Sequence, residues 1–392
     1  MMPLREQVIE AVEALAPELI ETARFLHQNP ELAFEERKAK ACLVQVLGRH
    51  GFFVEEGIGG LETAFLASPR KGSPAIAFLA EYDALPGIGH ACGHNLIAAA
   101  SLGAALALKP LLKDLEGTIL LIGCPAEEKG GGKIPLIRAG IFDRLDAALL
   151  IHPDNRTIIA SRSLAMRRLS VEFFGKAAHA AASPHLGINA LDAVILSFVH
   201  VNTLRQYLRP DARIHGIITH GGRAANIIPD YAAARFMIRA LDRGYLEDLH
   251  RKVEECLRGA AWGTGAKLKL TVEGNDYEPL LPNDRLASLF RTHLEELGVP
   301  VVDVPEDEGL GSTDVGNVSR VVPAIQPSVA ICHPPIACHS QEFAQAAGSE
   351  EGERMMLLSA KALALTALDL LTDRGKLAQI RAEFEARRGG ER

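Results

Sequence analysis

Residues 81–100 read EYDALPGIGHACGHNLIAAA, and this stretch decides the fold that we expect. It follows the apolar run PAIAFLA (74–80), which is typical of a buried strand, and leads into the Ala-rich run NLIAAASLGAALAL, which is typical of a buried helix. The Gly- and Pro-rich turn between them carries Cys92 and His94. Ligands of α/β folds bind at the carboxyl ends of strands, where this turn would lie. A cysteine and a histidine two residues apart suit a divalent metal, although a buried thiol and a helix-capping histidine would give the same pattern.

Further short apolar runs place this strand and helix in a larger sheet. They are TAFLA (63–67), TILLIGC (118–124) and DAALLIH (146–152), and helical stretches separate several of them. Strands that alternate with helices predict an α/β fold, with a mixed, largely parallel sheet covered by helices.

The alternation of apolar strands with helices changes to a different order of predicted elements near residue 168. Residues 168–278 are predicted to form strand, helix, strand, strand, helix and strand, with alternating apolar positions in the strands. This order matches the split βαβ, or ferredoxin-like, arrangement. We therefore predict an α+β domain at 168–278, inserted into a larger domain made of 1–167 and 279–392.

Composition narrows the class of protein. A chain of 392 residues with 48% hydrophobic and 23% charged residues is expected to form two globular domains. The net charge of −7 disfavours nucleic acid as a partner. We find no uncharged apolar run near the roughly 20 residues that cross a bilayer, and no secretory signal, so we expect no membrane partner. Six scattered cysteines then favour free thiols and a cytoplasmic location.

A second group of candidate residues follows the strand TILLIGC. The segment PAEEKGGGK (125–133) places Glu127 and Glu128 side by side on a loop. Activation of a water by a metal needs one carboxylate on the metal and another that takes the proton, and adjacent glutamates can divide these roles. Alone, such a pair is usually solvated charge. A phosphate-binding loop is disfavoured because GGGK lacks the Walker spacing.

Two histidines complete the candidate site. His152 is expected to end the strand DAALLIH, and His339 lies in ICHPPIACHSQEF. Each alone could be an ordinary residue, but together they add ligands at strand ends that one crevice can collect. Cys92 and His94 as nucleophile and base are disfavoured, because a cysteine hydrolase would not need the glutamate pair.

These motifs resemble the amidohydrolase and dipeptidase branch of peptidase family M-twenty, which includes p-aminobenzoyl-glutamate hydrolases, aminoacylases and Xaa-Arg dipeptidase-like proteins. The matching segments run in family order from about residue 24 to 348. They are HQNPELAFEE, EYDALPGIGHACGHN, PAEEKGGGK, IHP, GKAAHAAASP, NIIPDYAAARF, GSTDVGNVS and the His339 segment. The resemblance implies a zinc-exopeptidase-like catalytic domain, with the inserted domain as a lid and dimerisation domain.

The resemblance also implies roles for single residues. Two divalent ions, zinc or manganese, would be held by Cys92, His94, Glu128, His152 and His339, with Glu127 as the general base. His179 and Asn226 would reach the substrate, His179 from across a homodimer interface and able to stabilise an oxyanion. Ser312 and Thr313 of GSTDVGNVS are expected to line the site. Glu81 stands where many relatives outside this branch carry a histidine ligand, so that ligand is absent here.

We therefore expect a metal-dependent hydrolase that cleaves the amide bond of a small N-acyl amino acid or dipeptide. The alternatives are a hydrolase of another small aromatic or xenobiotic amide, and a catalytically inactive metal-binding relative. Arg223, Arg235 and Arg239 could hold a substrate carboxylate or could be ordinary surface charges.

Overall fold

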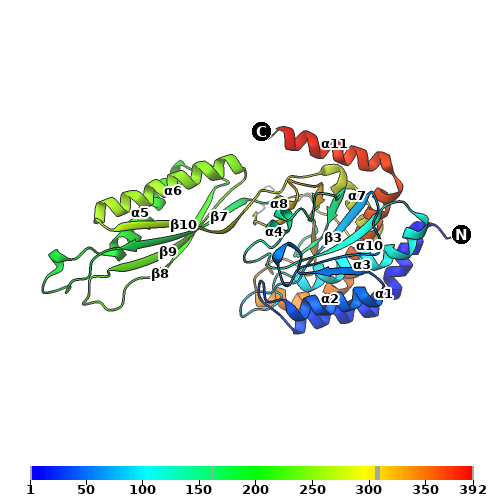
Figure 1. Ribbon diagram of the computed structural model, residues 1–392, viewed down its shortest axis with the longest axis horizontal. Helices are drawn as coiled ribbons and strands as arrows, with labels where there is room; N and C mark the ends of the chain where they lie inside the picture. The colour runs from blue at the N-terminus through cyan, green and yellow to red at the C-terminus, as the bar shows by residue number, and fades with distance from the viewer. Residues whose placement is uncertain (1, 160–161, 305–309, 391–392) are drawn as a thin grey trace. The chain divides into compact units, whose positions relative to one another are not determined.

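The computed structural model describes residues 2–159, 162–304 and 310–390. The chain forms two compact units (Figure 1). Unit 1 comprises Met1–Arg162 and Leu280–Arg392, and unit 2 comprises Ser163–Pro279.

The centre of unit 1 is a sheet of six strands in the order β1-β2-β4-β3-β5-β11. The bounds are β1 Phe53–Glu56, β2 Phe65–Ser68, β3 Ala75–Glu81, β4 Thr118–Cys124, β5 Ala147–Leu149 and β11 Ala324–Ile325. β3 is parallel to both β4 and β5, and β11 is parallel to β5, whereas β2 is antiparallel to β1 and β4. All seven residues of β3 are buried, which agrees with the continuous apolar run in its sequence. The prediction of a mixed, largely parallel sheet is confirmed.

Helices surround this sheet. The set is α1 Leu4–Gln28, α2 Arg37–Arg49, α3 His94–Leu108, α4 Lys133–Arg138, α7 Asp284–Glu296, α8 Val315–Val318, α9 Gln341–Ala347, α10 Glu350–Thr372 and α11 Arg374–Gly390. Helices α1, α3 and α10 pack against one another, and α3 also packs on β3 (Figure 1). Every residue of α3 is buried, so its Ala-rich composition allows close packing on all sides.

Two helical segments of unit 1 are long and apolar enough, by length and composition, to span a membrane. They are His94–Asp114 and Glu350–Thr372, and 89% and 72% of their apolar windows are buried inside the protein. Such burial is typical of core helices, because an apolar helix in the centre of a protein passes the same length and composition test.

One predicted strand is wrong in detail. The run DAALLIH does not form a single strand that ends at His152; β5 ends at Leu149, and His152 begins a separate strand, β6 (His152–Asp154). The pairing partner changes at the same point, because β5 pairs with β11 while β6 pairs with β12 (Ser328–Ala330). Pro327 lies in the break between β11 and β12, where the His152 N–H donates to the Pro327 carbonyl over 2.8 Å.

Unit 2 has its own sheet and core. Its elements are β7 Ala165–Phe174, α5 Ala190–Leu204, β8 Arg213–His220, β9 Tyr231–Ala240, α6 Arg243–Thr264 and β10 Lys267–Tyr277. The four strands form an antiparallel sheet in the order β10-β7-β9-β8, and α5 and α6 pack together on the sheet. The α+β fold predicted for the insertion is confirmed, whereas a lid or dimerisation role, and the boundaries at 167/168 and 278/279, stay predictions.

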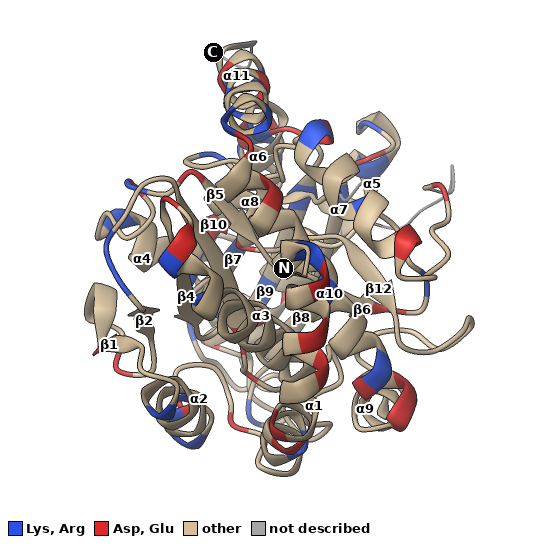
Figure 2. Ribbon diagram, turned by 90° about the vertical axis from the view of Figure 1, so that its right-hand side faces the viewer, with Lys and Arg blue, Asp and Glu red and all other residues tan. Residues whose placement is uncertain are grey.

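Lys and Arg residues, in blue, and Asp and Glu residues, in red, are interspersed along the ribbon in Figure 2.

Candidate metal centre

The candidate site lies where β3 and β4 end. The two strands are parallel, and Glu81 at the end of β3 is in register with Cys124 at the end of β4. The turn after β3 and the loop after β4 therefore leave the sheet at the same edge. A hydrogen bond joins them, because the Glu128 N–H donates to Asp83 Oδ2 over 3.0 Å.

Side chains near these strand ends form three groups that could each hold a metal ion. The first is Cys92, His94 and His152, the second is Cys92, Glu128 and His339, and the third is His94, Glu127 and Glu128, with the ligand atoms of each group within 4.8 Å of one another. The first two groups share the Cys92 sulfur and together contain all five predicted ligands. Residues far apart in the sequence are thus brought together, and the five predicted ligands form one cluster.

The histidines of the first group present lone pairs to this cluster. His94 Nδ1 lies 3.0 Å from Asp83 Oδ1, and donation along this bond leaves Nε2 as the coordinating nitrogen. His94 is fully buried and its Nε2 has no hydrogen-bond partner. A buried polar atom without a partner costs roughly 1–3 kcal/mol, which coordination to a cation would offset. His152 Nδ1 similarly lies 2.7 Å from the Pro153 carbonyl. The side chains present therefore fit divalent metal ions.

The shared ligand is the thiol of Cys92. It is buried, and a hydrogen bond with Cys338 together with this burial raises its pKa well above the ordinary value. Coordination to a cation deprotonates a thiol, so a bound metal would reverse the shift. A mixed set of sulfur, imidazole nitrogen and carboxylate oxygen is typical of zinc, and manganese and cobalt remain compatible with the nitrogen and oxygen ligands.

The adjacent glutamates differ in their electrostatics. Burial, followed by the charges of Glu81 and Glu128, raises the pKa of Glu127 well above its ordinary value. Burial opposes ionisation of Glu128 too, but a hydrogen bond from His339 and the charge of His94 lower its pKa to about 2. Pairs of carboxylates whose environments separate their pKa values are typical of acid and base residues with different roles.

The backbone of the site is strained. Among the described residues, three that are not glycine have positive φ: Phe34 (67°), Ala126 (58°) and His339 (67°). Ala126 directly precedes Glu127, and His339 is itself a predicted ligand. Such conformations cost energy and cluster at functional sites, where the surrounding structure enforces them.

A buried ion cluster beside the ligands was missed by the sequence analysis. Lys133 Nζ lies 2.6 Å from Glu81 Oε1 and 2.5 Å from Asp314 Oδ1, and all three side chains are fully buried. Glu81 Oε2 lies 3.7 Å from His94 Nε2. Glu81, at the position where many relatives outside this branch carry a histidine ligand, thus connects the cluster of predicted ligands to a buried lysine. A lysine that follows three glycines is typical of a solvated loop, so the sequence did not indicate the contact of Lys133 with Glu81 and Asp314.

The predicted substrate residues of unit 2 lie together. The Ala180 N–H donates to the Asn226 carbonyl over 3.0 Å, and His179 forms a bridge with Ile227. His179 is exposed, and its Nδ1 accepts from the Ala181 and Ala182 N–H groups at 3.2 and 3.1 Å. Nε2 therefore carries the hydrogen and is available as a donor.

Ser312 and Thr313 belong to unit 1 and directly precede the buried Asp314. Asp314 Oδ2 accepts from the Lys133 N–H over 3.0 Å, which ties their loop to the segment that carries Glu127 and Glu128. Arg235, one of the three arginines that could hold a substrate carboxylate, forms an ion pair, with its Nε 3.3 Å from Glu273 Oε1.

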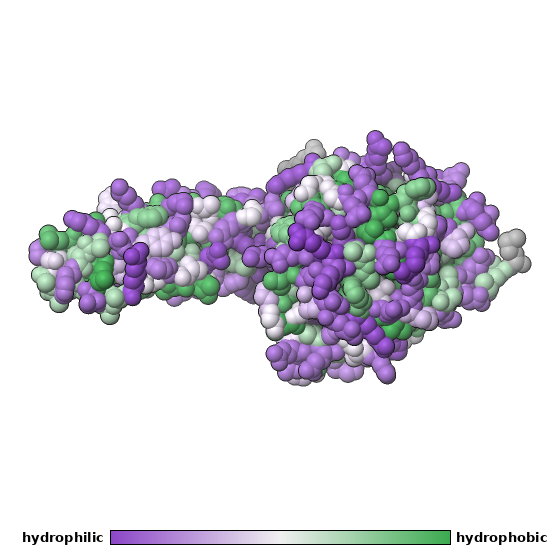
Figure 3. Space-filling view, turned by 60° about the horizontal axis from the view of Figure 1, so that its bottom comes forward, coloured by the Kyte–Doolittle hydropathy of each residue, from purple (hydrophilic) through white to green (hydrophobic). Residues whose placement is uncertain are grey.

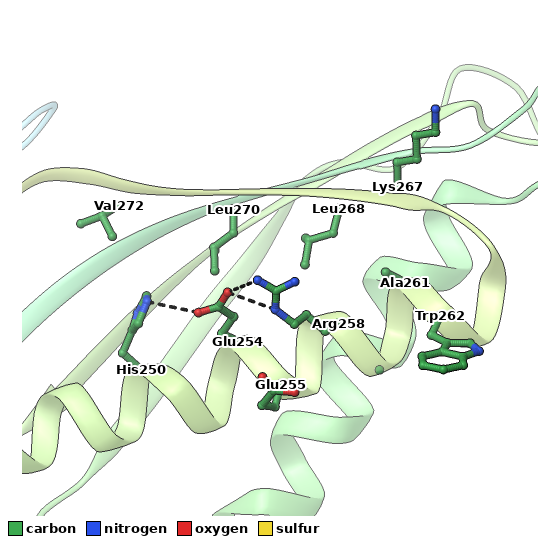
Figure 4. Close-up of a pocket in the computed structure, with 11 residues that line it drawn as sticks. His250, Glu254, Glu255, Arg258, Ala261, Trp262, Lys267, Leu268, Leu270 and Val272 are labelled. Atoms are coloured by element: carbon green, nitrogen blue, oxygen red, sulfur yellow. Dashed lines mark hydrogen bonds and ion pairs between the residues drawn. The ribbon is translucent and has the colours of Figure 1, made fainter.

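A wide groove of about 920 Å³ lies on unit 2 between α6 and β10 (Figure 4). Its lining includes Glu254, which pairs with both His250 and Arg258, and the exposed Trp262. The metal-ligand groups found among the described residues all lie in unit 1. The candidate site is therefore placed in unit 1 because the metal-ligand side chains lie there, although the large groove lies on unit 2.

A mixed α/β sheet with metal-ligand groups at its strand ends, and an inserted antiparallel α+β unit, is the arrangement expected of a metal-dependent hydrolase. The model of peptidase family M20/M25/M40 matches residues 77–362, and the chain belongs to this family of hydrolases.

Relatives of known activity cover nearly the whole chain. The chain is 38% identical to Xaa-Arg dipeptidase of Mus musculus, over 98% of this chain and 93% of the relative. It is 30% identical to one of the subunits of p-aminobenzoyl-glutamate hydrolase from Escherichia coli, over 98% of this chain and 95% of the relative.

Solved structures share the fold. An aminobenzoyl-glutamate utilization protein from Klebsiella pneumoniae aligns with a TM-score of 0.70 at 21% identity, covering 92% of this chain and 97% of that one. A Bacillus subtilis protein described as a dinuclear metal binding peptidase of the M20 family aligns with a TM-score of 0.64 at 20% identity, covering 91% and 99%. The prediction of the family and of its fold is confirmed.

Proposed function

We propose that this hydrolase cleaves the amide bond of a small N-acyl amino acid or dipeptide at a centre of two divalent ions, zinc or manganese. The observation that carries the proposal is the pair of ligand groups that share Cys92, with Glu127 beside them. Cys92, His94 and His152 would hold one ion, and Cys92, Glu128 and His339 the other.

Residues of the chain would transfer the proton, bind the ions and orient the ligands. Bound ions would lower the pKa of a water and polarise the substrate carbonyl. Glu127 would take the proton of that water and return it to the leaving amine, because its environment favours a carboxyl group that binds a proton. Glu128 stays ionised and suits a ligand. Asp83 orients His94 and the Glu128 backbone through its two oxygens.

For the substrate we propose contacts from His179, Asn226, Ser312 and Thr313. His179 has a donor at Nε2 that suits a developing oxyanion. The similarity to Xaa-Arg dipeptidase, at 38% identity over nearly the full length, makes dipeptides that end in arginine the first class to test. The six free cysteines agree with the proposed cytoplasmic location.

A panel of amides tests the proposal. We expect hydrolysis of at least one of alanylarginine, N-acetyl amino acids and p-aminobenzoyl-glutamate by protein supplied with zinc or manganese, and loss of that hydrolysis with a chelator. Retention of activity after metal removal would contradict metal catalysis. Absence of hydrolysis across the panel by folded, metal-loaded protein would contradict this substrate class and favour an inactive metal-binding relative.

We also propose a homodimer that forms through unit 2. Its edge strand β8 pairs, among the described strands, with β9 alone, and it exposes 64% of Ile217 and 46% of Ile218. Exposed apolar side chains appear as green patches on this unit (Figure 3). An open apolar strand edge favours pairing with a second chain. Sedimentation analysis should show a dimer that Ile217→Lys dissociates, and a monomeric unmodified chain would contradict the proposal.

A further inference from the structure

Hydrogen bonds hold the backbone of Glu127 on both sides. The N–H of Ala126, before Glu127, donates to Glu36 Oε1 over 2.8 Å. The N–H of Glu128, after it, donates to Asp83 Oδ2 over 3.0 Å. Asp83 lies close to the metal ligands in sequence, whereas Glu36 comes from the segment HQNPELAFEE, 90 residues before Ala126.

Glu36 accepts a second backbone hydrogen bond. It is fully buried, and its Oε1 also accepts from the Phe34 N–H over 2.9 Å. The Phe34 ring lies against Gly130, where an added Cβ would come within 2.5 Å of Phe34 Cε2. The N-terminal segment is anchored next to the metal turn as well, because the Ala84 N–H donates to the Glu31 carbonyl over 2.8 Å. Residues 34–36 therefore contact the loop of Glu127 near its start, at Ala126, and near its end, at Gly130.

This support matters because the backbone before Glu127 is strained. Ala126 has a φ of 58°, a left-handed conformation that is unfavourable for an alanine. A strained conformation persists where surrounding contacts enforce it. The bond to Glu36 is one such contact on the Ala126 amide, and without it the loop can relax and move the Glu127 carboxyl group.

We infer that Glu36 is a positioning residue for Glu127, and that it acts by accepting the hydrogen bond of the Ala126 amide. The inference rests on the proposed role of Glu127 as general base. Glu36 itself is fully buried and is not among the ligand groups, so it acts through the loop and not on the substrate.

Substitutions of Glu36 distinguish a role as hydrogen-bond acceptor from a role that only fills space. Glu36→Met keeps the length of the side chain without an acceptor, and Glu36→Gln keeps a carbonyl oxygen in its place. On the panel amide that the unmodified chain hydrolyses fastest, we expect Glu36→Met to lower kcat about 10–100-fold at unchanged KM and metal content, because small displacements of a catalytic group have effects of this size. Glu36→Gln should retain most of kcat. Glu35→Met, at the exposed neighbouring position, is the matched control and should change nothing.

If Glu36→Met does not fold, Glu36→Asp gives the same test, since it withdraws the acceptor by one methylene, and we expect it to lower kcat at unchanged KM. Three results would overturn the inference: full kcat in the variant without the acceptor, a loss explained by lower metal content, or equal losses in Glu36→Gln and Glu36→Met. Glu127→Gln distinguishes failure of the proposed function. If that variant stays active, the general-base role fails; if it is inactive while Glu36→Met keeps full kcat, the positioning inference alone fails.

Discussion

Glu127→Gln is expected to lower kcat by about 10³-fold or more while metal content and fold stay unchanged. An amide has the shape of the carboxylate but cannot accept the proton of the attacking water, and general-base catalysis contributes about 10²–10⁴-fold to a reaction of this kind. Glu127 is 8% exposed, so a neutral side chain of the same size is also accommodated without repacking. Steady-state kinetics on the best panel substrate, with metal counted in the same sample, measure the effect.

Glu128→Gln provides the comparison for this result. Glu128 is ionised at neutral pH and belongs to the ligand group with Cys92 and His339, so its substitution should reduce metal binding as well as activity. A Glu127→Gln variant that keeps a tenth or more of kcat would show that another group takes the proton. A variant that loses metal to the same extent as Glu128→Gln would make Glu127 a ligand instead.

Lys133→Met is expected to destabilise unit 1 by about 3–5 kcal/mol, because removing one partner of a buried ion pair leaves an uncompensated buried charge. Lys133 is the cation 2.6 Å from Glu81 and 2.5 Å from Asp314, and none of the three side chains is exposed. Burial is the main cause that raises the pKa of Asp314 to about 6, so the loss should grow as the pH rises through that value and Asp314 ionises. Urea unfolding at pH 8 measures the change.

Two further variants make this result specific. Lys113 pairs with Asp114 at 3.9 Å on the surface, so Lys113→Met is a matched control that should leave the stability unchanged. Adding Glu81→Gln to Lys133→Met removes one of the two uncompensated carboxylates and should recover part of the loss. Additive losses from Glu81→Gln and Lys133→Met would contradict a direct interaction between these side chains.

Much of the candidate site could be predicted because its ligands lie in short turns after apolar strands. Cys92, His94, Glu127 and Glu128 follow β3 and β4, and parallel strands bring their carboxyl ends to one edge. The structure brings His152 and His339 to the same cluster. The strand assignment of His152 was wrong, because β5 and β6 pair with two separate strands, β11 and β12, that lie far along the chain.

The supporting residues could not be predicted, since their roles depend on burial. Glu36 lies in a charged segment and Lys133 follows three glycines, and both patterns are typical of solvated surface. The fold buries both side chains completely and gives them backbone amides or carboxylates as partners. No local pattern shows which charged residue will be enclosed by segments 90 or more residues away.

The number of ions that the site binds can be measured by titration of metal-free protein with zinc, manganese or cobalt, with bound metal counted and amide hydrolysis measured at each addition. We expect two ions per chain and activity that rises with occupancy. We also expect a thiolate-to-cobalt absorption that Cys92→Ser abolishes and Cys332→Ser leaves intact, because Cys92 belongs to both of the groups that would hold the ions. Full activity without metal, or a cobalt absorption that survives Cys92→Ser, would contradict the proposed metal centre.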